Sequence, residues 1–586
     1  MAEQALENRR AAGALLAAFH GLGLRRLVLC PGSRSGPLAL AAAALEPHGL
    51  QLFTAIDERS AAFFALGLAR ADGLPAAVVT TSGTAVAELL PAAVEADRSA
   101  LPLLLLTADR PERLKDCGAN QTVNQEAFLL PVCRLLLQGP MAGLHGADDA
   151  RLATMARTVW RHCLGLPAGP VHLNLPFEEP LHAAIGSAPP PPAISRNNAP
   201  ETVLSADAPA PALDPDQPGV IVAGPWRRGA AAGFAGALRR LCRRTGWPVL
   251  ADPASGLRGL PLPVVAGYDA LLADPALVPP VGQVLRLGSL PASRRLHDWL
   301  AGLEAIQELV SEGDPRRLDP VNGGVRQCCD GLEAWEAALA PGEPGAASVA
   351  LAGRWQRAEA ALQAGLDREL APEGPLSEPA LARWLQRQLP DGLPVMLANS
   401  SPVRDWESWA GSPARQRPVV SFRGASGIDG TLSLAAGLAA AWGTVLLVTG
   451  DLALLHDGNG WLWRQELARR APAARLRMLL IDNGGGGLFE QLPIPRQGLD
   501  FDRLFAMPQA VDPLALAAAH GVPARRGAER LDQLADDLEW LLAPEANDPL
   551  RLLRLGTDRA ADGALRRRLL QPPGPAGWWQ PPTTLS

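Results

Sequence analysis

Two polar residues in the last third of the chain follow short apolar runs at a spacing that suits a cation site. Asp451 follows residues 444–450, Asn483 follows residues 476–482, and glycines occupy 484–487. A carboxylate oxygen, an amide oxygen and a backbone carbonyl are hard ligands that suit Mg²⁺ rather than Zn²⁺. Glycines let a backbone approach a diphosphate closely. The pattern predicts a magnesium and diphosphate site, and a tight turn that closes an α/β unit is the structural alternative.

Near the other end of the chain, Glu58 is the most notable titratable residue. It follows an apolar run at 52–56 and opens a helical pattern at 59–71. A carboxylate in the first turn of a helix complements the helix dipole, which is the structural explanation for this residue. The other polar residues that follow apolar runs in this region, and that could line one cleft with Glu58, are Ser33, Arg34, Ser82 and Arg110.

The elements that must position these residues alternate between strand-like and helical patterns. Such alternation predicts parallel sheets covered by helices on both faces, with their ligands at the carboxyl ends of the strands. A helix is expected at 84–96, and a short apolar helix at 488–492 could wall a pocket. The predicted strands cover 27–30, 52–56, 77–81, 103–107, 220–224, 249–252, 395–398, 419–422, 444–450 and 476–482.

The fold class predicted from this alternation is α/β, with three α/β domains. At 586 residues the chain is too long for one hydrophobic core. Proline-rich and helical stretches separate the domains, and the middle domain is expected to be mainly scaffold. The predicted divisions are a first domain at 1–185, a Pro-rich linker at 186–218, a central domain at 219–340, a helical and Pro-rich bridge at 341–375, a last domain at 376–570 and a docked or frayed tail at 571–586.

Composition narrows the function classes. The net charge of −6 argues against a nucleic-acid or membrane-surface partner. We expect no membrane span and a cytoplasmic location, because no long apolar run or basic leader is present and the seven cysteines show no metal or disulfide spacing. Lys115 is the only lysine, so arginine clusters carry less weight than usual. The absence of a Gly-Lys-Ser/Thr motif excludes a Walker A loop.

The segment that contains Asp451 and Asn483 resembles the signature of thiamine-diphosphate-dependent enzymes, a Gly-Asp pair followed by a helix and a strand that ends in Asn-Asn. The resemblance implies that Asp451, Asn483 and the carbonyl of Gly485 hold Mg²⁺ or Mn²⁺ beside the cofactor's diphosphate. Leu452 replaces the usual glycine, Asp482 replaces the first asparagine, and the interval between the ligands is longer than usual. None of these departures removes an expected ligand.

The same resemblance gives Glu58 a chemical role. In this family a glutamate at that place hydrogen-bonds the aminopyrimidine ring and promotes the imino tautomer that removes the thiazolium proton. The first domain would then bind the pyrimidine and the last domain the diphosphate. Because different subunits hold the two ends of the cofactor in this family, the resemblance implies a homodimer or homotetramer with sites at the subunit interface.

Five further motifs resemble the SEPHCHC synthase family, whose members make 2-succinyl-5-enolpyruvyl-6-hydroxy-3-cyclohexene-1-carboxylate in menaquinone and phylloquinone biosynthesis. They lie at 30–35, 81–86, 106–111, 117–121 and 423–430. The resemblance implies a transferase that decarboxylates 2-oxoglutarate on thiamine diphosphate and adds the succinyl carbanion equivalent to isochorismate in a 1,4-addition. Both substrates carry two carboxylates, which suits arginine's planar fork.

By family position, two sets of residues are expected at the site. The apolar residues among the expected cofactor contacts would exclude water from the reacting carbon. Substrate contacts are expected from Ser33, Arg34, Arg110, Gln121, Arg294, Arg295, Ser400, Arg404 and Arg423, although Arg294 and Arg295 could also be a solvated pair. Cofactor contacts are expected from Glu58, Ile428, Asp451, Leu452, Ala453, Asn483, Leu488, Phe489 and Leu492.

Two other classes of protein are weighed against this interpretation. Another thiamine enzyme, such as an acetohydroxyacid synthase or a simple 2-oxoacid decarboxylase, would lack the motifs at 30–34 and 423–430 and would need fewer arginines. A non-catalytic or nicotinamide-binding α/β protein would carry a Gly-x-Gly-x-x-Gly after a first strand, which is absent. The sequence leaves open the quinone made, the metal used, dimer or tetramer, and any feedback site.

Overall fold

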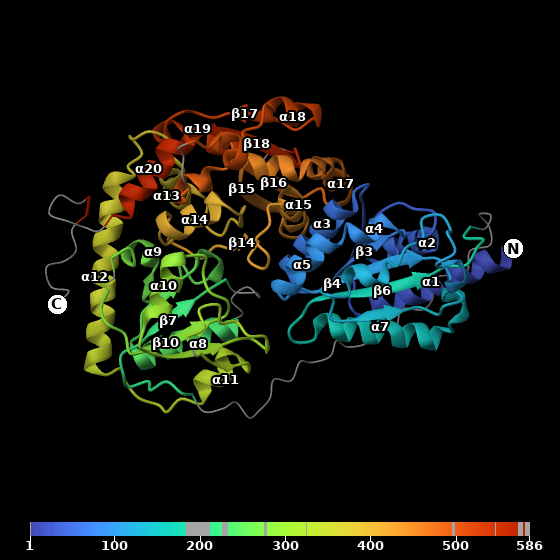
Figure 1. Ribbon diagram of the computed structural model, residues 1–586, viewed down its shortest axis with the longest axis horizontal. Helices are drawn as coiled ribbons and strands as arrows, with labels where there is room; N and C mark the ends of the chain where they lie inside the picture. The colour runs from blue at the N-terminus through green and yellow to red at the C-terminus, as the bar shows by residue number, and fades with distance from the viewer. Residues whose placement is uncertain are drawn as a thin grey trace.

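Three parallel six-stranded sheets with helices on their faces make up the protein (Figure 1). This arrangement confirms the predicted α/β fold class. The predicted domain boundaries stay a prediction, and most of the predicted linker and tail lie outside the described residues. Among the described residues no helix is both long and apolar enough to cross a membrane. The computed structural model describes residues 2–182, 211–225, 232–274, 278–323, 325–494, 498–544, 547–571 and 578–579.

The first sheet has the strand order β2-β1-β3-β4-β6-β5. Its central strands are buried along their whole length, as expected for a sheet with helices on both faces. The predicted helix at 84–96 is wrong in one respect: it is two helices, because Pro91 has no N–H with which to continue the first. The elements are α1 (Ala2–Leu22), β1 (Arg26–Leu29), α2 (Gly36–Leu45), β2 (Gln51–Thr54), α3 (Glu58–Asp72), β3 (Ala76–Thr80), α4 (Thr84–Ala87), α5 (Leu90–Arg98), β4 (Leu103–Asp109), α6 (Glu126–Leu129), β5 (Leu136–Gln138), α7 (Asp149–Leu164) and β6 (Pro170–Pro176).

The second sheet has the order β12-β11-β10-β7-β8-β9. A 24-residue helix, α12 (Ala346–Glu369), runs beside it toward the third sheet (Figure 1). The predicted tail contributes Trp579, which is buried in the core cluster that also holds α12 side chains. The elements of this sheet are β7 (Val220–Ala223), α8 (Ala232–Thr245), β8 (Val249–Ala251), β9 (Val264–Val265), α9 (Tyr268–Leu271), β10 (Gln283–Leu287), α10 (Arg294–Gly302), β11 (Ile306–Val310), β12 (Arg326–Cys328) and α11 (Gly331–Ala337).

The third sheet has the order β14-β13-β15-β16-β18-β17. Its two middle strands pair from Thr444 with Arg475 to Gly450 with Ile481, so the residues that follow them leave the sheet side by side. The elements are α13 (Glu378–Gln388), β13 (Val395–Leu397), α14 (Ser401–Trp409), β14 (Val419–Ser421), α15 (Thr431–Trp442), β15 (Thr444–Gly450), α16 (Asp451–His456), α17 (Trp463–Arg470), β16 (Arg475–Asp482), α18 (Pro513–Ala519), β17 (Ala524–Arg526), α19 (Ala535–Leu542), β18 (Leu550–Gly556) and α20 (Arg559–Leu569).

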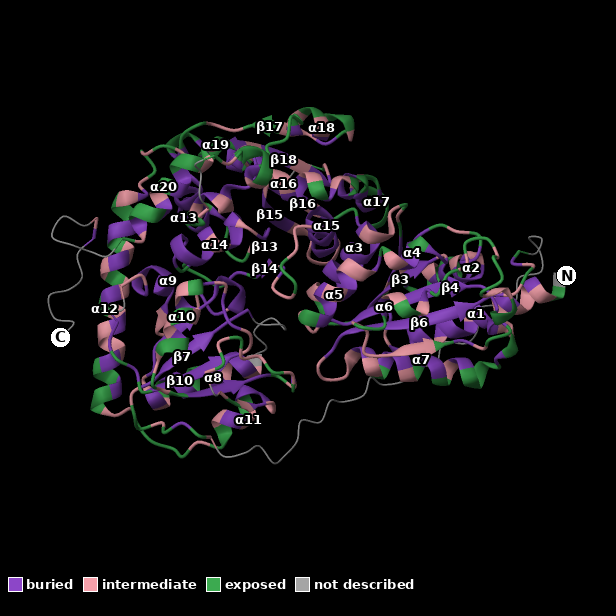
Figure 2. Ribbon diagram, viewed as in Figure 1, coloured by how far each residue is buried: buried purple, intermediate pink, exposed green. Residues whose placement is uncertain are grey.

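The first and last domains share one hydrophobic core, in which α3 crosses α15. Figure 2 shows both helices largely buried at this crossing. Glycines sit where the helices touch: a Cβ on Gly67 would clash with the backbone oxygen of Leu434, and one on Gly437 with that of Phe64. Close approach of the two backbones therefore requires glycine at both positions.

Replacing Gly67 by alanine should destabilise the protein by about 1–3 kcal/mol, the usual cost of overpacking a well-filled interior. Thermal unfolding followed by circular dichroism measures the effect. The matched control is Gly236→Ala in α8, where the nearest atom to an added Cβ is 3.5 Å away. There the better helix propensity of alanine should leave stability unchanged or raised by up to about 1 kcal/mol. Equal melting temperatures for the two variants would contradict the crossing argument.

The central domain is fixed to the last domain by Arg258, which is buried. Its guanidinium donates to the carbonyl oxygens of Trp406 (3.3 Å), Glu407 (2.9 Å) and Gly411 (3.2 Å) at the end of α14. A cation at a helix C-terminus satisfies its last carbonyls and complements its dipole. Arg258 thus holds the C-terminal end of α14 in place.

Glu407 forms a second buried link between these domains. It accepts hydrogen bonds from the Tyr268 hydroxyl (2.5 Å) and the Ser293 amide (3.1 Å). Burial, with the carboxylates of Asp252 and Asp269 as further causes, raises the pKa of Glu407 to about 8. The side chain is therefore neutral in the folded protein at pH 7, whereas it ionises near 4.5 once unfolded.

This difference predicts a pH-dependent stability. Because the folded pKa is raised, the stability contributed by neutral Glu407 is complete below pH 4.5 and is lost as pH rises through about 8. Glu407→Gln keeps an acceptor but cannot ionise. Between pH 5 and 8 the wild type should lose stability relative to this variant, by up to about 1.4 kcal/mol per pH unit. Melting temperatures measured across that range test this, with exposed Glu539→Gln as the control. A difference independent of pH would contradict it.

Candidate active site

A cavity of about 290 Å³ opens at the carboxyl ends of β15 and β16. Its lining comes from α13, the turn into α14, the loop at 426–428, the start of α16 and the glycine-rich turn at 485–487. The three residues predicted as metal ligands, Asp451, Asn483 and Gly485, all line it. The parallel register of the two strands explains this, since it places the residues after them at one edge of the sheet.

Asp451 is the first residue of α16 and is held at both carboxylate oxygens. Oδ1 accepts from the Leu452 amide (2.8 Å) and Oδ2 accepts from the Gly485 amide (2.7 Å). Burial, together with Asp482 and Glu378 nearby, raises the pKa of Asp451 to about 6. A buried carboxylate among other carboxylates favours a bound cation, which would offset their repulsion.

Asn483 is oriented by its amide nitrogen. Nδ2 donates to Oε1 of Glu378 (2.6 Å), whereas the buried Oδ1 has no hydrogen-bond partner among the described residues. A buried amide oxygen left unpaired costs about 1–3 kcal/mol. Asn483 thus presents an unsatisfied hard oxygen in the same cavity as Asp451, and this donor set fits Mg²⁺ or Mn²⁺.

The turn at 484–487 forms a cradle that only glycine permits at its centre. Gly485 has φ of +117°, and a Cβ there would clash with the carbonyl oxygen of Ala506. Backbone amides at such a turn and at the start of α16 suit the diphosphate of a cofactor. In the described part of the chain, no group of three His, Cys, Asp or Glu side chains forms an alternative metal site.

The apolar wall of the cavity contains most of the predicted side chains. Ile428, Leu452, Ala453, Leu488 and Phe489 line the cavity. The predicted apolar helix is a 3₁₀ helix at Gly487–Gln491 rather than at 488–492, and Leu492 lies beyond it, 47% exposed and outside the lining. The hydrogen bonds of this 3₁₀ helix span three residues, as from the Phe489 amide to the Gly486 carbonyl (3.0 Å).

Ser400 and Arg404 bring polar groups to the cavity from the first turn of α14. The Arg404 guanidinium donates to the Ser400 carbonyl (2.7 Å), and Ser400 has the strained φ of +75° that is typical of functional turns. Burial, and then the charge of nearby Arg423, lower the pKa of Arg404. Two arginines close enough to repel each other favour an anion between them.

The loop that carries Arg423 and Ile428 is tied to the first domain. The carboxylate of Glu95 on α5 accepts from the amides of Gly424 (2.9 Å) and Ala425 (2.6 Å). Glu95 is buried, so water does not compete for these two hydrogen bonds. The sequence did not suggest it, because Glu95 falls within an ordinary amphipathic helix.

The first-domain residues form a cluster of their own. Arg110 donates to the Ser82 hydroxyl and to the Gln121 carbonyl (2.7 Å), and Gln121 Nε2 donates to the Ser82 carbonyl (2.9 Å). Burial, and then Arg34 nearby, lower the pKa of Arg110. Arg34 is buried and bonded to Glu179 (2.6 Å). Arg34 and Arg110 are therefore a second pair of mutually repelling arginines, in the first domain. Ser33, which directly precedes Arg34, is exposed.

Glu58 opens α3, after Asp57 caps the helix by accepting from the Ser60 amide (3.0 Å). Burial, together with Asp57 and Glu88, raises the pKa of Glu58. The next residue of the helix contacts the end of α16: Arg59 donates to the His456 carbonyl (3.1 Å). Glu58 is not part of the lining of the cavity at Asp451, and neither are Ser33, Arg34, Arg110 and Gln121.

The two arginines predicted in the central domain also lie outside this cavity. Arg294 is 84% exposed in its side chain and pairs with Asp298 one turn on (2.9 Å). Arg295 pairs with Asp269 (2.6 Å), a buried residue at the junction with α14. Within one chain they make these ion pairs, and their contact with substrate stays a prediction.

The cavity residues that the sequence reasoning missed include Glu378, Asn399 and Ser426. Asn399 donates to the Gly427 carbonyl (2.6 Å) and so shapes the loop before Ile428. The polar turn after β13 was a usable signal for Asn399. Glu378 opens a helix over a hundred residues before Asn483, and no local pattern connects the two.

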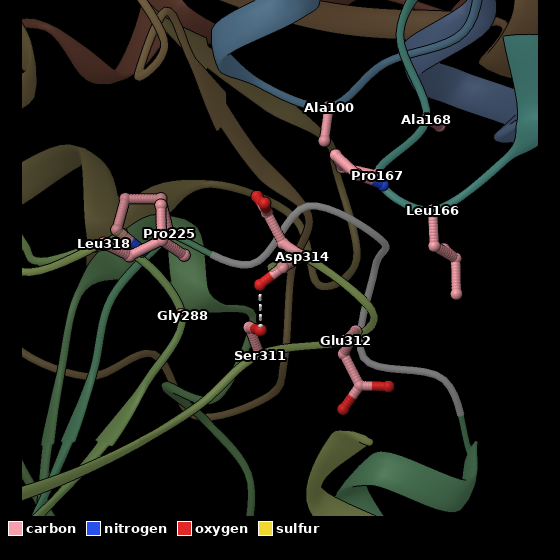
Figure 3. A pocket seen from close by; sticks show the side chains of 10 residues that line it. All are labelled: Ala100, Leu166, Pro167, Ala168, Pro225, Gly288, Ser311, Glu312, Asp314 and Leu318. Carbon is pink, nitrogen blue, oxygen red and sulfur yellow. Dashed lines mark hydrogen bonds between the residues drawn. The ribbon is translucent and has the colours of Figure 1, made fainter. Parts of the chain in front are cut away.

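A second, smaller cavity of about 50 Å³ lies between the first and central domains. Figure 3 shows its apolar wall at Leu166 and Leu318 and its two carboxylates, Glu312 and Asp314. Ser311 donates to the carbonyl oxygen of Asp314 across it (2.7 Å). None of the predicted site residues lines this cavity, which is too small for a cofactor.

Comparison with known proteins agrees with this geometry. Residues 9–128 match the family model described as the thiamine pyrophosphate enzyme, N-terminal TPP binding domain. The chain is 63% identical to the 2-succinyl-5-enolpyruvyl-6-hydroxy-3-cyclohexene-1-carboxylate synthase of Synechococcus sp. (strain RCC307) over 99% of both chains. It is 53% identical to that of Synechococcus sp. (strain CC9311), covering 93% of this chain and 97% of the relative. For that of Prochlorococcus marinus (strain MIT 9313), the identity is 51%, over 94% and 97%.

Proposed function

Because the chain belongs to the 2-succinyl-5-enolpyruvyl-6-hydroxy-3-cyclohexene-1-carboxylate synthase family of thiamine pyrophosphate enzymes, we propose that it decarboxylates 2-oxoglutarate and adds the resulting four-carbon unit to isochorismate. The observation that carries the proposal is the unpaired amide oxygen of Asn483 in the cavity that Asp451 and Gly485 line. It is the feature expected of a metal and diphosphate site. The proposed location is the cytoplasm, since the cysteines are all free.

In this proposal Asp451, Asn483 and the Gly485 carbonyl hold Mg²⁺ or Mn²⁺, and the glycine turn accommodates the diphosphate. Thiamine diphosphate, when bound, supplies the nucleophile and the electron sink for decarboxylation of a 2-oxoacid. Glu58 holds a proton for exchange with a ring nitrogen of the cofactor, for which its raised pKa is suited. Ile428, Leu488 and Phe489 exclude water from the reacting carbon.

The proposed active unit is a dimer or a dimer of dimers. Among the residues that the structure describes, none from the first domain lines the cavity at Asp451, so a single chain does not bring Glu58 to it. Ile56, beside Glu58, is a large apolar side chain that is 75% exposed. A second copy that covers this surface would place its own cavity against Glu58, and a symmetric pair would then have two complete sites.

The arginines match the charge of the proposed substrates. One pair, Arg34 and Arg110, lies at the rim of the first sheet, and the other, Arg404 and Arg423, lies by the third. 2-Oxoglutarate and isochorismate each carry two carboxylates, and the addition product carries three, because one carboxylate leaves as CO₂. Bidentate contacts from two arginine pairs would neutralise and orient them, whereas a monocarboxylic 2-oxoacid such as pyruvate needs only one.

The test is an assay of purified protein with thiamine diphosphate and Mg²⁺. Consumption of 2-oxoglutarate should be faster with isochorismate than without it, and mass spectrometry should detect the addition product. Pyruvate in place of 2-oxoglutarate should be a poor substrate. Preference for pyruvate, or indifference to isochorismate, would instead indicate an acetohydroxyacid synthase or a simple decarboxylase. Sedimentation of the active protein as a monomer would contradict the proposed dimer.

A further inference from the structure

We propose that Glu378 is a positioning residue that fixes the amide of Asn483 with its oxygen toward the metal site. The inference rests on the proposed function, because it concerns the metal that holds the cofactor. The two ends of an asparagine amide have nearly the same shape but opposite hydrogen-bonding character. Only the orientation with the oxygen toward the cavity offers a ligand to a cation, so a neighbouring group must fix the amide in that orientation.

The negatively charged carboxylate of Glu378 fixes the orientation of the Asn483 amide. This carboxylate only accepts hydrogen bonds, so it can bond only the Nδ2 end of Asn483 (2.6 Å). The opposite end, Oδ1, is then left buried and, within the described part of the chain, without a hydrogen-bond partner. Rotation of the amide by 180° would set oxygen against carboxylate and turn NH₂ toward the cation.

The carboxylate of Glu378 is itself held by a buried hydrogen-bond network that joins α13, α14 and α20. Its other oxygen accepts from Arg566 Nη2 on α20 (2.6 Å), and Asp405 on α14 accepts from Nε of the same guanidinium (2.8 Å). The Glu378 amide donates to Asp562 on α20 (3.1 Å). Glu378 and Arg566 are each 2% exposed. Glu378 therefore cannot rotate away, and ligand orientation depends on residues far from the metal site in sequence.

The same network predicts what Glu378→Gln does. Arg566 has only donors, so the glutamine must turn its oxygen to Arg566 and its NH₂ to Asn483. Asn483 then satisfies this donor by turning its own oxygen away from the metal site. Outer-shell changes of this kind typically weaken metal binding 10–100-fold, and we expect a loss in that range.

A charge swap distinguishes orientation from a general structural effect. Asn483→Asp alone should also weaken metal binding, although it adds a negative charge. The new carboxylate would face the carboxylate of Glu378 and be repelled by it. In the double variant Glu378→Gln/Asn483→Asp, the glutamine NH₂ donates to one oxygen of the new carboxylate, and the other oxygen remains for the metal. Binding should return to within a few-fold of the wild type.

The measurement is Mn²⁺ affinity of the full-length protein by electron paramagnetic resonance, with thiamine diphosphate present in excess. Weak binding by both single variants with recovery in the double variant supports the proposal. Unchanged affinity in Glu378→Gln, or a double variant no better than the single ones, would overturn it. Should Glu378→Gln fail to fold, Asn483→Asp alone decides: equal or tighter binding would overturn the proposal. Failure of the wild type to bind Mn²⁺ would instead contradict the proposed function.

Discussion

Replacement of Glu58 by glutamine should lower kcat by about 10²–10⁴-fold, the range expected when a positioned acid–base group is lost. Glutamine keeps the shape and hydrogen-bonding reach of the side chain but cannot exchange a proton. The helix should be unaffected, since Asp57 rather than Glu58 provides the cap. Steady-state rates with 2-oxoglutarate and isochorismate measure the loss, and calorimetric titration with thiamine diphosphate measures cofactor binding, which should change far less.

The matched control is Glu539→Gln, the same change at an exposed residue of α19. It should leave both kcat and cofactor affinity unchanged. A Glu58→Gln variant with a rate within a few-fold of the wild type would show that the carboxylate is a helix-terminal charge only, which is the structural alternative that the sequence left open.

The second large effect is expected at the metal site. Asp451→Asn removes the only carboxylate among the proposed ligands and should weaken Mg²⁺ binding by more than about 100-fold, since even outer-shell changes cost 10–100-fold. Thiamine diphosphate should then fail to bind at Mg²⁺ concentrations that saturate the wild type. Fluorescence titration of the protein with Mg²⁺ at fixed cofactor concentration measures both effects.

Asp482→Asn tests whether any carboxylate at this edge of the sheet could serve as the metal ligand. Asp482 ends β16 next to Asn483, but its side chain pairs with Arg554 (2.7 Å) rather than lining the cavity. Its amide variant should keep Mg²⁺ affinity within a few-fold of the wild type. Equal losses from the two variants would point to the summed negative charge of this edge, and a loss at Asp482 alone would exclude Asp451 as the ligand.

Local sequence determined much of this protein. Apolar runs that end in polar turns dictated three parallel sheets, and they placed Asp451 and Asn483 at one edge because neighbouring parallel strands end together. The sequence also predicted a backbone role for the glycines at 484–487, and the structure adds that Gly485 has a positive φ and lies against the Ala506 carbonyl. The family signature rested on the same short segments, and the full-length relatives agree with it.

Where the sequence reasoning was wrong, a local backbone constraint decided the outcome. The helix expected at 84–96 breaks because proline lacks a donor. The helix expected at 488–492 is a 3₁₀ helix one residue earlier, at Gly487–Gln491, whose hydrogen bonds span three residues. Pro91 was visible in the sequence, but the apolar pattern outweighed it in the interpretation.

Contacts between distant segments were decided only by the tertiary structure. Glu378 meets Asn483, Glu95 holds the loop that carries Arg423, and Arg258 bonds the end of α14. Each joins residues more than a hundred positions apart, so no periodicity or motif encodes the pairing. The sequence thus specified which groups could bind a metal and a diphosphate. Which way Asn483 turns its amide is fixed by buried charges that folding brings together, because a carboxylate accepts hydrogen bonds and cannot donate them.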